Sequence, residues 1–284
     1  MRRQAPITYI GVPICFRRGA SFLLARNLAS GVLIVLFTDF GLAGPYTGQV
    51  KAVLESEAPG VSVIDLFADA PAANPTAASP LLAAYDDMFP PGTVFLCIVD
   101  PGVGGDRAPL CLNIDGCWYV GPENGLFEHV MRQAAGAVTC WEILWRPERL
   151  SSTFHGRDLF APIAAAVASG EIPGVEGRYA PLEPAIVRRP GWPDDLFEVV
   201  YIDHYGNAIT GIRARNLPFD CGLSIAGNHV PRYETFSSVS PGQVFCYENS
   251  NGLIEIAINQ GEAAAELAIN IGMKVTKSFV PLEE

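Results

Sequence analysis

The stretch of sequence that decides the fold is TVFLCIVDPGVGGDR, residues 93–107. Its first seven residues are apolar or β-branched, as in a strand buried on both faces, and the run stops abruptly at Asp100. A glycine-rich segment follows, and beyond it two strand-like runs, 110–114 and 117–120, flank the hairpin-forming pair Asp115-Gly116. We therefore expect a buried strand that ends in a polar loop and is followed by an antiparallel hairpin.

Strand-like and helix-like segments alternate on both sides of this stretch. The expected strands are 32–37, 61–66 and 137–144, and the expected helices are 45–57, 73–87, 124–134 and 157–169. Strands that alternate with helices favour a parallel sheet covered by helices on both faces. The sequence thus predicts an α/β domain with a mostly parallel sheet over residues 31–186.

The composition changes near residue 190. A segment rich in proline and glycine, 187–196, is typical of a linker. The expected strands after it are 197–202, 222–226, 243–247, 253–258 and 273–279, and the one expected helix is 262–268. Short strands separated by turns predict a smaller all-β domain over 197–284, either a barrel or a sandwich.

The first 38 residues contain five arginines and no acidic residue. Organellar transit peptides have this character, and an upstream start codon assigned in error would explain it too. We treat residues 1–30 as a basic N-terminal extension. No run reaches the roughly 18 apolar residues of a membrane span, so we expect no membrane insertion.

The charge balance excludes two classes of partner. The chain of 284 residues carries a net charge of −11, which repels the phosphate backbone of nucleic acids and anionic membrane surfaces. Its seven cysteines form no CxxC pair and no Cys/His spacing typical of a metal site. We therefore expect no metal, a reducing cytoplasmic location, and a small molecule as the partner.

Two carboxylates come directly after expected strands. Asp39 follows the first strand and Asp100 the central one, and ligands of parallel sheets collect at the carboxyl ends of strands. A carboxylate at the position of Asp39 can accept hydrogen bonds from a ribose diol. A structural role, namely capping a turn or a helix entry, explains each of them at least as well when it is taken singly.

Other polar candidates lie at a helix entry and in two turns. His155 precedes the helix expected over 157–169, where the helix dipole favours a neutral imidazole that can act as a base or orient water. In the C-terminal half, the turn 203–207 brings an aromatic residue close to Asn207, which suits an adenine ring, and 249–252 is a similar polar turn. A packing histidine and ordinary hairpin turns are the open alternatives.

Six segments combine these candidates in one order: Thr38–Gly41, Asp100–Gly104 with Arg107, Gly121–Gly125, Ser152–Asp158, Gly206-Asn207 and Asn249–Asn259. In this combination the chain resembles the S-adenosylmethionine hydrolases, also called the S-adenosylmethionine hydroxide adenosyltransferases. That family is related to fluorinating and chlorinating enzymes. The resemblance runs over about residues 32–280.

The resemblance implies a fold, an assembly and a reaction. It implies an α/β N-terminal domain, a smaller β-barrel domain, and a homotrimer whose active sites lie between one subunit's N-terminal domain and its neighbour's C-terminal domain. It also implies hydrolysis of S-adenosylmethionine to adenosine and L-methionine without a cofactor. By position, the water-activating trio would be Asp100, Arg107 and His155. Substrate contacts would fall on Asp39, Asp203, Tyr205, Asn207, Ser250, Glu255 and Ile258.

Three alternative functions are halogenation, methyl transfer and nucleoside binding without catalysis. The halogenating relatives lack the Asp, Arg and His combination, which favours water over halide as the nucleophile. The pattern that begins at Asp100 also resembles the glycine loop of S-adenosylmethionine-dependent methyltransferases, but that loop continues into a helix, whereas we expect a hairpin. A non-catalytic nucleoside-binding module would keep Asp39 and Asn207 without needing Arg107 and His155 together.

Overall fold

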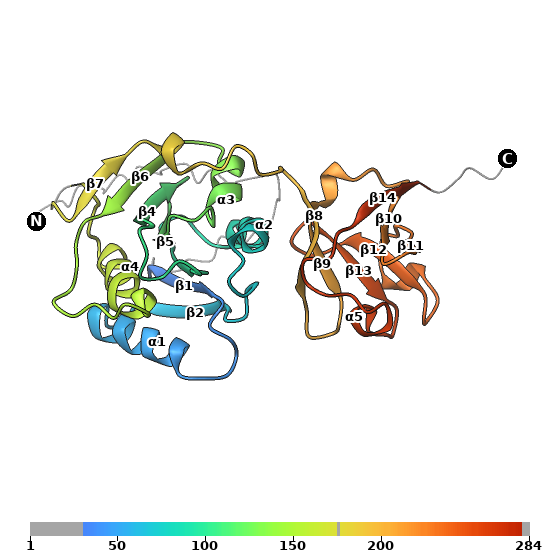
Figure 1. The fold of residues 1–284 in the computed structure, drawn as a ribbon, viewed down its shortest axis with the longest axis horizontal. Helices are drawn as coiled ribbons and strands as arrows, with labels where there is room; N and C mark the ends of the chain where they lie inside the picture. Colours follow the sequence, from blue (N-terminus) through green and yellow to red (C-terminus); the bar gives the residue numbers. More distant parts are fainter. Residues whose placement is uncertain (1–30, 175–176, 280–284) are drawn as a thin grey trace, which may run out of the picture. The chain divides into compact units, whose positions relative to one another are not determined.

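The computed structural model describes residues 31–174 and 177–279, so the basic extension predicted over 1–30 lies outside the described residues. The N-terminal part contains a seven-stranded sheet with the order β2-β1-β3-β5-β4-β6-β7 (Figure 1). Its strands are β1 (Leu33–Thr38), β2 (Ser62–Phe67), β3 (Val94–Ile98), β4 (Pro109–Ile114), β5 (Cys117–Pro122), β6 (Val138–Ile143) and β7 (Tyr179–Leu182).

The sheet is mostly parallel, as predicted. Strands β2, β1, β3 and β5 run in one direction, whereas β4 is antiparallel to both β5 and β6, and β7 is antiparallel to β6. The reversal comes from the predicted β4–β5 hairpin, in which Asp115 and Gly116 both adopt positive φ. A hairpin therefore follows the glycine loop, and the helix that the methyltransferase pattern requires at this point is not formed.

Helices cover both faces of the sheet. Helices α1 (Tyr46–Glu57) and α4 (Ala161–Ala168) pack on one face, and α2 (Pro75–Tyr85) and α3 (Glu128–Gln133) pack on the other (Figure 1). Strand β1 contributes Ile34 and Leu36 to the core between the sheet and α1 and α4. It contributes Val35 and Phe37 to the core between the sheet and α2 and α3, so its side chains alternate as in a strand buried on both faces.

The C-terminal part forms a closed barrel from two antiparallel sheets. One sheet has the order β11-β10-β14 and the other β12-β13-β9-β8. Their strands are β8 (Leu196–Ile202), β9 (Ala208–Arg213), β10 (Cys221–Ile225), β11 (Asn228–Val230), β12 (Val244–Glu248), β13 (Leu253–Ile258) and β14 (Thr276–Phe279).

Backbone hydrogen bonds close the barrel at both edges of the two sheets. Residues 273–275, just before β14, bond to 197–199 of β8, and Tyr233 and Cys246 join the end of β11 to β12. The two sheets share one core, onto which the short helix α5 (Ala263–Glu266) packs. Because both edges are joined, the barrel and not the sandwich is formed.

The segment predicted as a linker is held on helix α3. The buried carboxylate of Glu128 accepts from the side chain of Arg188 at 3.1 Å and from the backbone N–H of Arg189 at 2.7 Å. His129 Nε2 lies 3.1 Å from the carbonyl oxygen of Pro193. The boundaries of the two domains, 31–186 and 197–284, and of the linker, 187–196, stay predictions. The linker segment itself is held on α3 by these contacts.

Some element boundaries differ from the expectations. Strands β7, β9 and β11 were not predicted, because each is short or, like β9, interrupted by a glycine. The helix predicted over 124–134 begins only at Glu128, since Gly125 has a φ of +94° and breaks helical geometry. The helix predicted over 157–169 begins with a π-helical turn, Gly156–Phe160, before α4.

Two further expectations concern the membrane and the cysteines. No helix within 31–174 or 177–279 combines the length and the apolar content of a membrane span. The six cysteines in these residues are all buried, as small apolar side chains are. Cys15 lies outside the described residues.

Candidate functional site

Two carboxylates meet at the carboxyl edge of the parallel strands. Thr38, the last residue of β1, pairs with Ile98, the last residue of β3, so the residues that follow leave the sheet side by side. The N–H of Asp39 donates to the carbonyl of Ile98 at 3.1 Å, and its Oδ2 accepts from the N–H of Ala73 at 2.8 Å. Burial raises the pKa of Asp39, and the negative charge of nearby Asp100 adds to the rise.

Asp100, Arg107 and His155 form one hydrogen-bonded cluster. Arg107 Nε lies 3.1 and 3.0 Å from the two oxygens of Asp100, and Arg107 Nη2 lies 2.5 Å from Asp100 Oδ2. The same Nη2 lies 3.0 Å from Nδ1 of His155. The side chains of Arg107 and Asp100 are only 10% and 4% exposed, so this charge-assisted contact is shielded from water.

The contact with Arg107 assigns the proton of His155. A guanidinium only donates hydrogen bonds, so Nδ1 of His155 accepts one, and the neutral ring carries its hydrogen on Nε2. Burial lowers the pKa of His155, and the positive charge of Arg107 lowers it further. His155 is therefore a neutral imidazole whose free donor is Nε2–H.

A close contact between two loops brings His155 to Arg107. Gly104 has a φ of +80°, and a Cβ atom at this position would lie 2.4 Å from the carbonyl oxygen of Ser152. Only glycine allows the loop 100–107 to press against the loop 151–155 in this way. Asp158 fixes the second loop by accepting from the N–H of Ser151 at 2.9 Å.

One aromatic ring packs against the cluster, and two others lie beside Gly156, the residue after His155. The guanidinium of Arg107 lies 5.1 Å from the ring centroid of Phe160, in the π-helical turn. Phe40, Tyr46 and Phe154 form a second group, with ring centroids 5.4 to 6.1 Å apart. The ring of Phe160 thus adds a cation–π contact to the guanidinium that holds Asp100 and His155.

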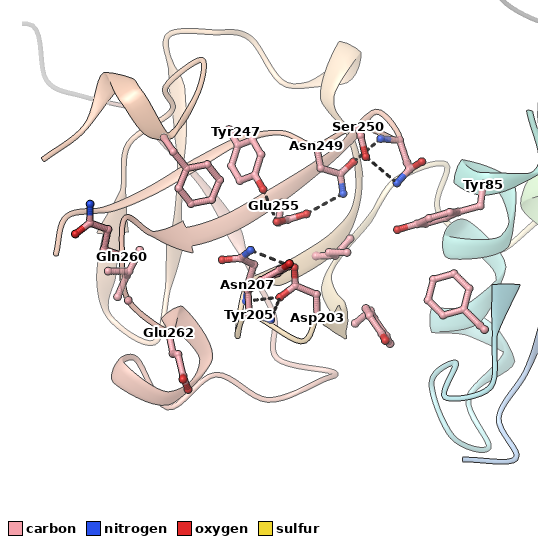
Figure 2. A pocket seen from close by; sticks show the side chains of 17 residues that line it. Tyr85, Asp203, Tyr205, Asn207, Tyr247, Asn249, Ser250, Glu255, Gln260 and Glu262 are labelled. Carbon is pink, nitrogen blue, oxygen red and sulfur yellow. Dashed lines mark hydrogen bonds between the residues drawn. The ribbon is translucent and has the colours of Figure 1, made fainter. Parts of the chain in front are cut away.

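A second set of predicted residues lines a cavity of about 830 Å³ on the barrel (Figure 2). All six of the predicted barrel contacts lie in its wall: Asp203, Tyr205, Asn207, Ser250, Glu255 and Ile258. The wall also contains six aromatic side chains: Phe67, Tyr85, Tyr201, Tyr205, Phe236 and Tyr247. Among the described residues that line it, none is Lys, Arg or His.

The polar wall of the cavity is a hydrogen-bonded network, drawn with dashed lines in Figure 2. Glu255 accepts from the hydroxyl of Tyr247, and also from Nδ2 of Asn249 at 3.0 Å. Burial raises the pKa of Glu255, and the charge of Asp203 adds to the rise. Asp203 accepts from the N–H of Asn207 at 2.9 Å and from its Nδ2 at 3.1 Å. The turn alternative is thus also correct for Asp203, since its oxygens shape the loop 203–207.

The predicted residues form two groups within the chain and not one. Of the described residues lining the cavity, none is Asp39, Asp100, Arg107 or His155. The trio and Asp39 lie at the carboxyl edge of the sheet, and the other predicted contacts lie on the barrel. Apart from Tyr205, the aromatic lining was not predicted, because residues such as Tyr85, Phe67 and Tyr247 lie in a helix or in strands, where aromatic residues usually belong to a core.

We also searched the described residues for a group of side chains that could bind a metal ion. Within 31–174 and 177–279, His, Cys, Asp and Glu side chains nowhere gather in a group of three that could hold a metal ion.

Two family models match the chain. The model of the SAM hydroxide adenosyltransferase N-terminal domain, where SAM is S-adenosylmethionine, matches residues 34–176. The model of the C-terminal domain of the same family matches residues 197–276. Together they cover both the sheet with its trio and the barrel with its cavity.

Individual relatives agree with the family models. An (R)-S-adenosyl-L-methionine hydrolase of Thermus thermophilus is 36% identical over 256 residues, which cover 85% of this chain and 98% of that protein. One of Salinispora arenicola is 33% identical, covering 86% and 97%. A fluorinase of Nocardia brasiliensis is more distant, at 24% identity, covering 86% and 95%.

Solved structures show the same fold. The structure of an uncharacterized conserved protein from Thermotoga maritima superposes with a TM-score of 0.74 at 28% identity, covering 87% of this chain and all of that one. A conserved hypothetical protein from Thermus thermophilus superposes with a TM-score of 0.69 at 34% identity, with the same coverage. The resemblance in sequence is confirmed, and the chain belongs to the SAM hydroxide adenosyltransferase family.

Proposed function

We propose that this chain hydrolyses S-adenosyl-L-methionine to adenosine and L-methionine, with water attacking the ribose C5′ atom. The observation that carries the proposal is the cluster of Asp100, Arg107 and His155 at the carboxyl edge of the sheet. Membership of the family and the names of its hydrolase relatives support the same reaction.

The leaving group of this substrate is already activated, whereas the nucleophile, water, must be activated by the protein. The sulfonium departs as neutral methionine, so no general acid is needed, and the C–S bond breaks as the C–O bond forms. The water must be held in line with that bond and must lose a proton. The sulfonium is itself the activated group, and we accordingly propose no cofactor.

The tautomer of His155 suggests a division of roles within the trio. Because Nδ1 is occupied by Arg107, His155 has a donor, Nε2–H, to orient the water oxygen, and no free lone pair to take its proton. The carboxylate of Asp100 is then the acceptor of the proton. Arg107 holds both groups and stabilises the developing hydroxide.

Substrate recognition is divided between the two groups of residues. We assign the ribose hydroxyls to Asp39, which stands beside Asp100 at the edge of the sheet. We assign the rest of the substrate to the barrel cavity, with Asn207, Ser250 and Ile258 among its contacts. Aromatic faces and carboxylates suit a substrate that combines a neutral adenine ring with a sulfonium cation, as S-adenosylmethionine does.

A homotrimer with sites between subunits would unite the two groups. One chain holds the trio and Asp39 in one place and the lined cavity in another. A second copy of the chain that presents its barrel to the sheet edge of the first would complete the site. We also propose a cytoplasmic location, for which the buried thiols of Cys97, Cys111, Cys140, Cys221 and Cys246 offer support.

The decisive experiment follows the oxygen atom. Purified protein is incubated with S-adenosylmethionine in ¹⁸O-labelled water, and the products are identified by mass spectrometry. We expect adenosine labelled at its 5′ hydroxyl together with unlabelled methionine. S-Adenosylhomocysteine as the product would mean methyl transfer, and tight adenosine binding without any product would mean a nucleoside-binding module.

The relatives' names specify the (R) configuration, which adds a finer test. Separate incubations with the (R) and (S) sulfonium epimers should show faster turnover of (R). Equal turnover rates for the two epimers would show that the protein does not select the configuration at sulfur, and they would not contradict hydrolysis.

A further inference from the structure

One motif of the sequence has no role in the proposed site. The segment Gly121–Gly125 comprises the last two residues of β5 and the three residues after it, and it supplies no side chain to the trio or to the lined cavity. It nevertheless contacts the chain on both sides of the loop 100–107, which carries Asp100 at one end and Arg107 at the other.

The first contact lies directly before Asp100. The parallel ladder between β3 and β5 pairs residues 94–96 with 118–120 and ends there, so it supplies no donor to the carbonyl of the buried residue Val99. The side chain of Asn124 replaces the missing donor, with Nδ2 at 2.8 Å from that carbonyl oxygen. A side-chain amide thereby fixes the peptide that places Asp100.

The second contact lies directly after Arg107. The N–H of Glu123 donates to the carbonyl of Ala108 at 2.8 Å. This bond continues the register of the β4–β5 hairpin by one step beyond the pair Pro109 and Pro122, so it ties Glu123 to the residue that follows Arg107. Asn124 and Glu123, neighbours in the loop 121–125, thus hold the two ends of the loop 100–107, which we call the catalytic loop.

The loop itself is anchored from the other side. Oδ1 of Asn124 accepts from the N–H of Leu126 at 3.2 Å, which sets the orientation of its amide. Glu123 forms an ion pair with Arg189 at 2.5 Å, and Gly125 lies so close to Trp192 that a Cβ atom would be 2.4 Å from its ring. Loop 121–125 is therefore held between the catalytic loop and the segment that leads to the barrel.

From these contacts we infer that Asn124 is a positioning residue for the hydrolytic reaction: its amide sets where Asp100 leaves the sheet and hence how the carboxylate meets Arg107. The inference rests on the proposed function. It assigns Asn124 no contact with substrate and places its effect on turnover, because a small displacement of reacting groups is costly in rate.

The test compares two substitutions with a matched control. Asn124→Asp keeps the size of the side chain and the acceptor for Leu126 but removes the donor to Val99, and Asn124→Ala removes both without adding charge. The control is Asn228→Asp, which removes a similar amide-to-carbonyl contact, Nδ2 to the oxygen of Ala226 at 3.2 Å, in the distant β10–β11 turn.

We expect kcat to fall about 10- to 100-fold in both Asn124 variants, with KM within about twofold of the wild type. Asn228→Asp should retain wild-type kcat. Wild-type kcat in Asn124→Asp, or a loss that appears in KM alone, would overturn the inference.

A second measurement does not depend on turnover. NMR titration of His155, assigned by comparison with His155→Gln, should show its pKa higher in Asn124→Ala than in the wild type, because Arg107 would no longer be held against Nδ1. An unchanged His155 pKa in the folded variant would overturn the inference even if the wild type formed no product. Absence of product with a shifted pKa would instead count only against the proposed reaction.

Discussion

Arg107 donates a hydrogen bond from Nη2 to Nδ1 of His155 at 3.0 Å while it holds the carboxylate of Asp100. The contact makes the cluster electrically balanced, with one anion, one cation and one neutral imidazole. A second proton on His155 would remove the acceptor and set two cations against each other in a largely buried place. The bond from Arg107 to Nδ1 of His155 therefore favours the neutral form of the imidazole.

The pH dependence of the reaction should report the depressed pKa of His155. Since burial and then Arg107 lower this pKa, the neutral ring is the active form, and it persists at pH values where an ordinary histidine is protonated. We expect kcat/KM to decline on the acid side with a midpoint below the usual histidine value of about 6.5. The measurement is a profile of kcat/KM from pH 4.5 to 8.

His155→Gln is the companion variant for this profile. It should turn over substrate about 10²- to 10⁴-fold more slowly, keep substrate binding, and lack the histidine limb. A wild-type midpoint above 6.5 would contradict the assigned environment of His155, and undiminished turnover in the variant would exclude His155 from the mechanism.

Replacement of Arg107 by lysine should be damaging although the charge is kept. A lysine ammonium is a point charge and cannot contact both oxygens of Asp100 and Nδ1 of His155 in one plane, as the guanidinium does. We expect kcat to fall roughly 10²-fold, in the range seen when a preorganised donor is lost. Steady-state kinetics and the dissociation constant of S-adenosylmethionine separate rate from binding.

Arg215→Lys serves as the control, because Arg215 is exposed at the surface of the barrel. It should behave as the wild type. If Arg107→Lys did so too, the paired geometry of the guanidinium would have no part in the reaction.

Mixing two inactive variants should restore activity if the sites lie between subunits. His155→Ala damages the sheet edge and Asn207→Ala damages the cavity, so neither homotrimer has an intact site. In randomly mixed trimers one site recombines two undamaged halves, and a 1:1 mixture refolded together should show about a quarter of wild-type activity.

Light scattering on the separate variants checks that each is still a trimer. A mixture of folded trimers that gains no activity would place both halves of the site in one subunit. A monomeric wild type would exclude the proposed assembly altogether.

Gly104→Ala should unfold more easily and turn over more slowly, and Gly60→Ala is its matched control. Both glycines have a φ near +80°, where a side chain costs about 1–2 kcal/mol. Only Gly104 has a backbone oxygen, that of Ser152, 2.4 Å from the added Cβ, whereas Gly60 has open space.

We therefore expect the melting temperature to fall by a few degrees in both variants and further in Gly104→Ala. Only Gly104→Ala should also lose kcat, because the loops that carry Arg107 and His155 must separate. Equal effects of the two substitutions would show that the contact with Ser152 does not hold the cluster together.

Much of the fold could be predicted because local pattern decides it. The apolar run 93–99 became β3, and the Asp115-Gly116 pair became the tip of the β4–β5 hairpin, since a turn of this kind is fixed by the two residues that form it. Strand β9 was missed because its Gly211 looks like a break. It is in fact a point of close approach, where a Cβ atom would lie 2.7 Å from the side chain of Leu196.

The candidate site was predictable only in part. Asp39 and Asp100 could be placed at one edge, because parallel strands end on the same side of a sheet. The aromatic wall of the cavity could not, since nothing local distinguishes Tyr85 or Tyr247 from a core residue. Residue type and position in the chain do not reveal which apolar side chains the final packing leaves facing a cavity.

The sequence by itself determined most of the helices and strands, the turn of the β4–β5 hairpin and the family, because hydrophobic period, glycine turns and six ordered motifs are local properties of the chain. Only the tertiary structure decided that Arg107 donates to Nδ1 of His155, which leaves the hydrogen of the neutral ring on Nε2. The physical reason is that this contact joins residues 48 positions apart through the close contact of Gly104 with Ser152, and no local pattern specifies the distance between two loops.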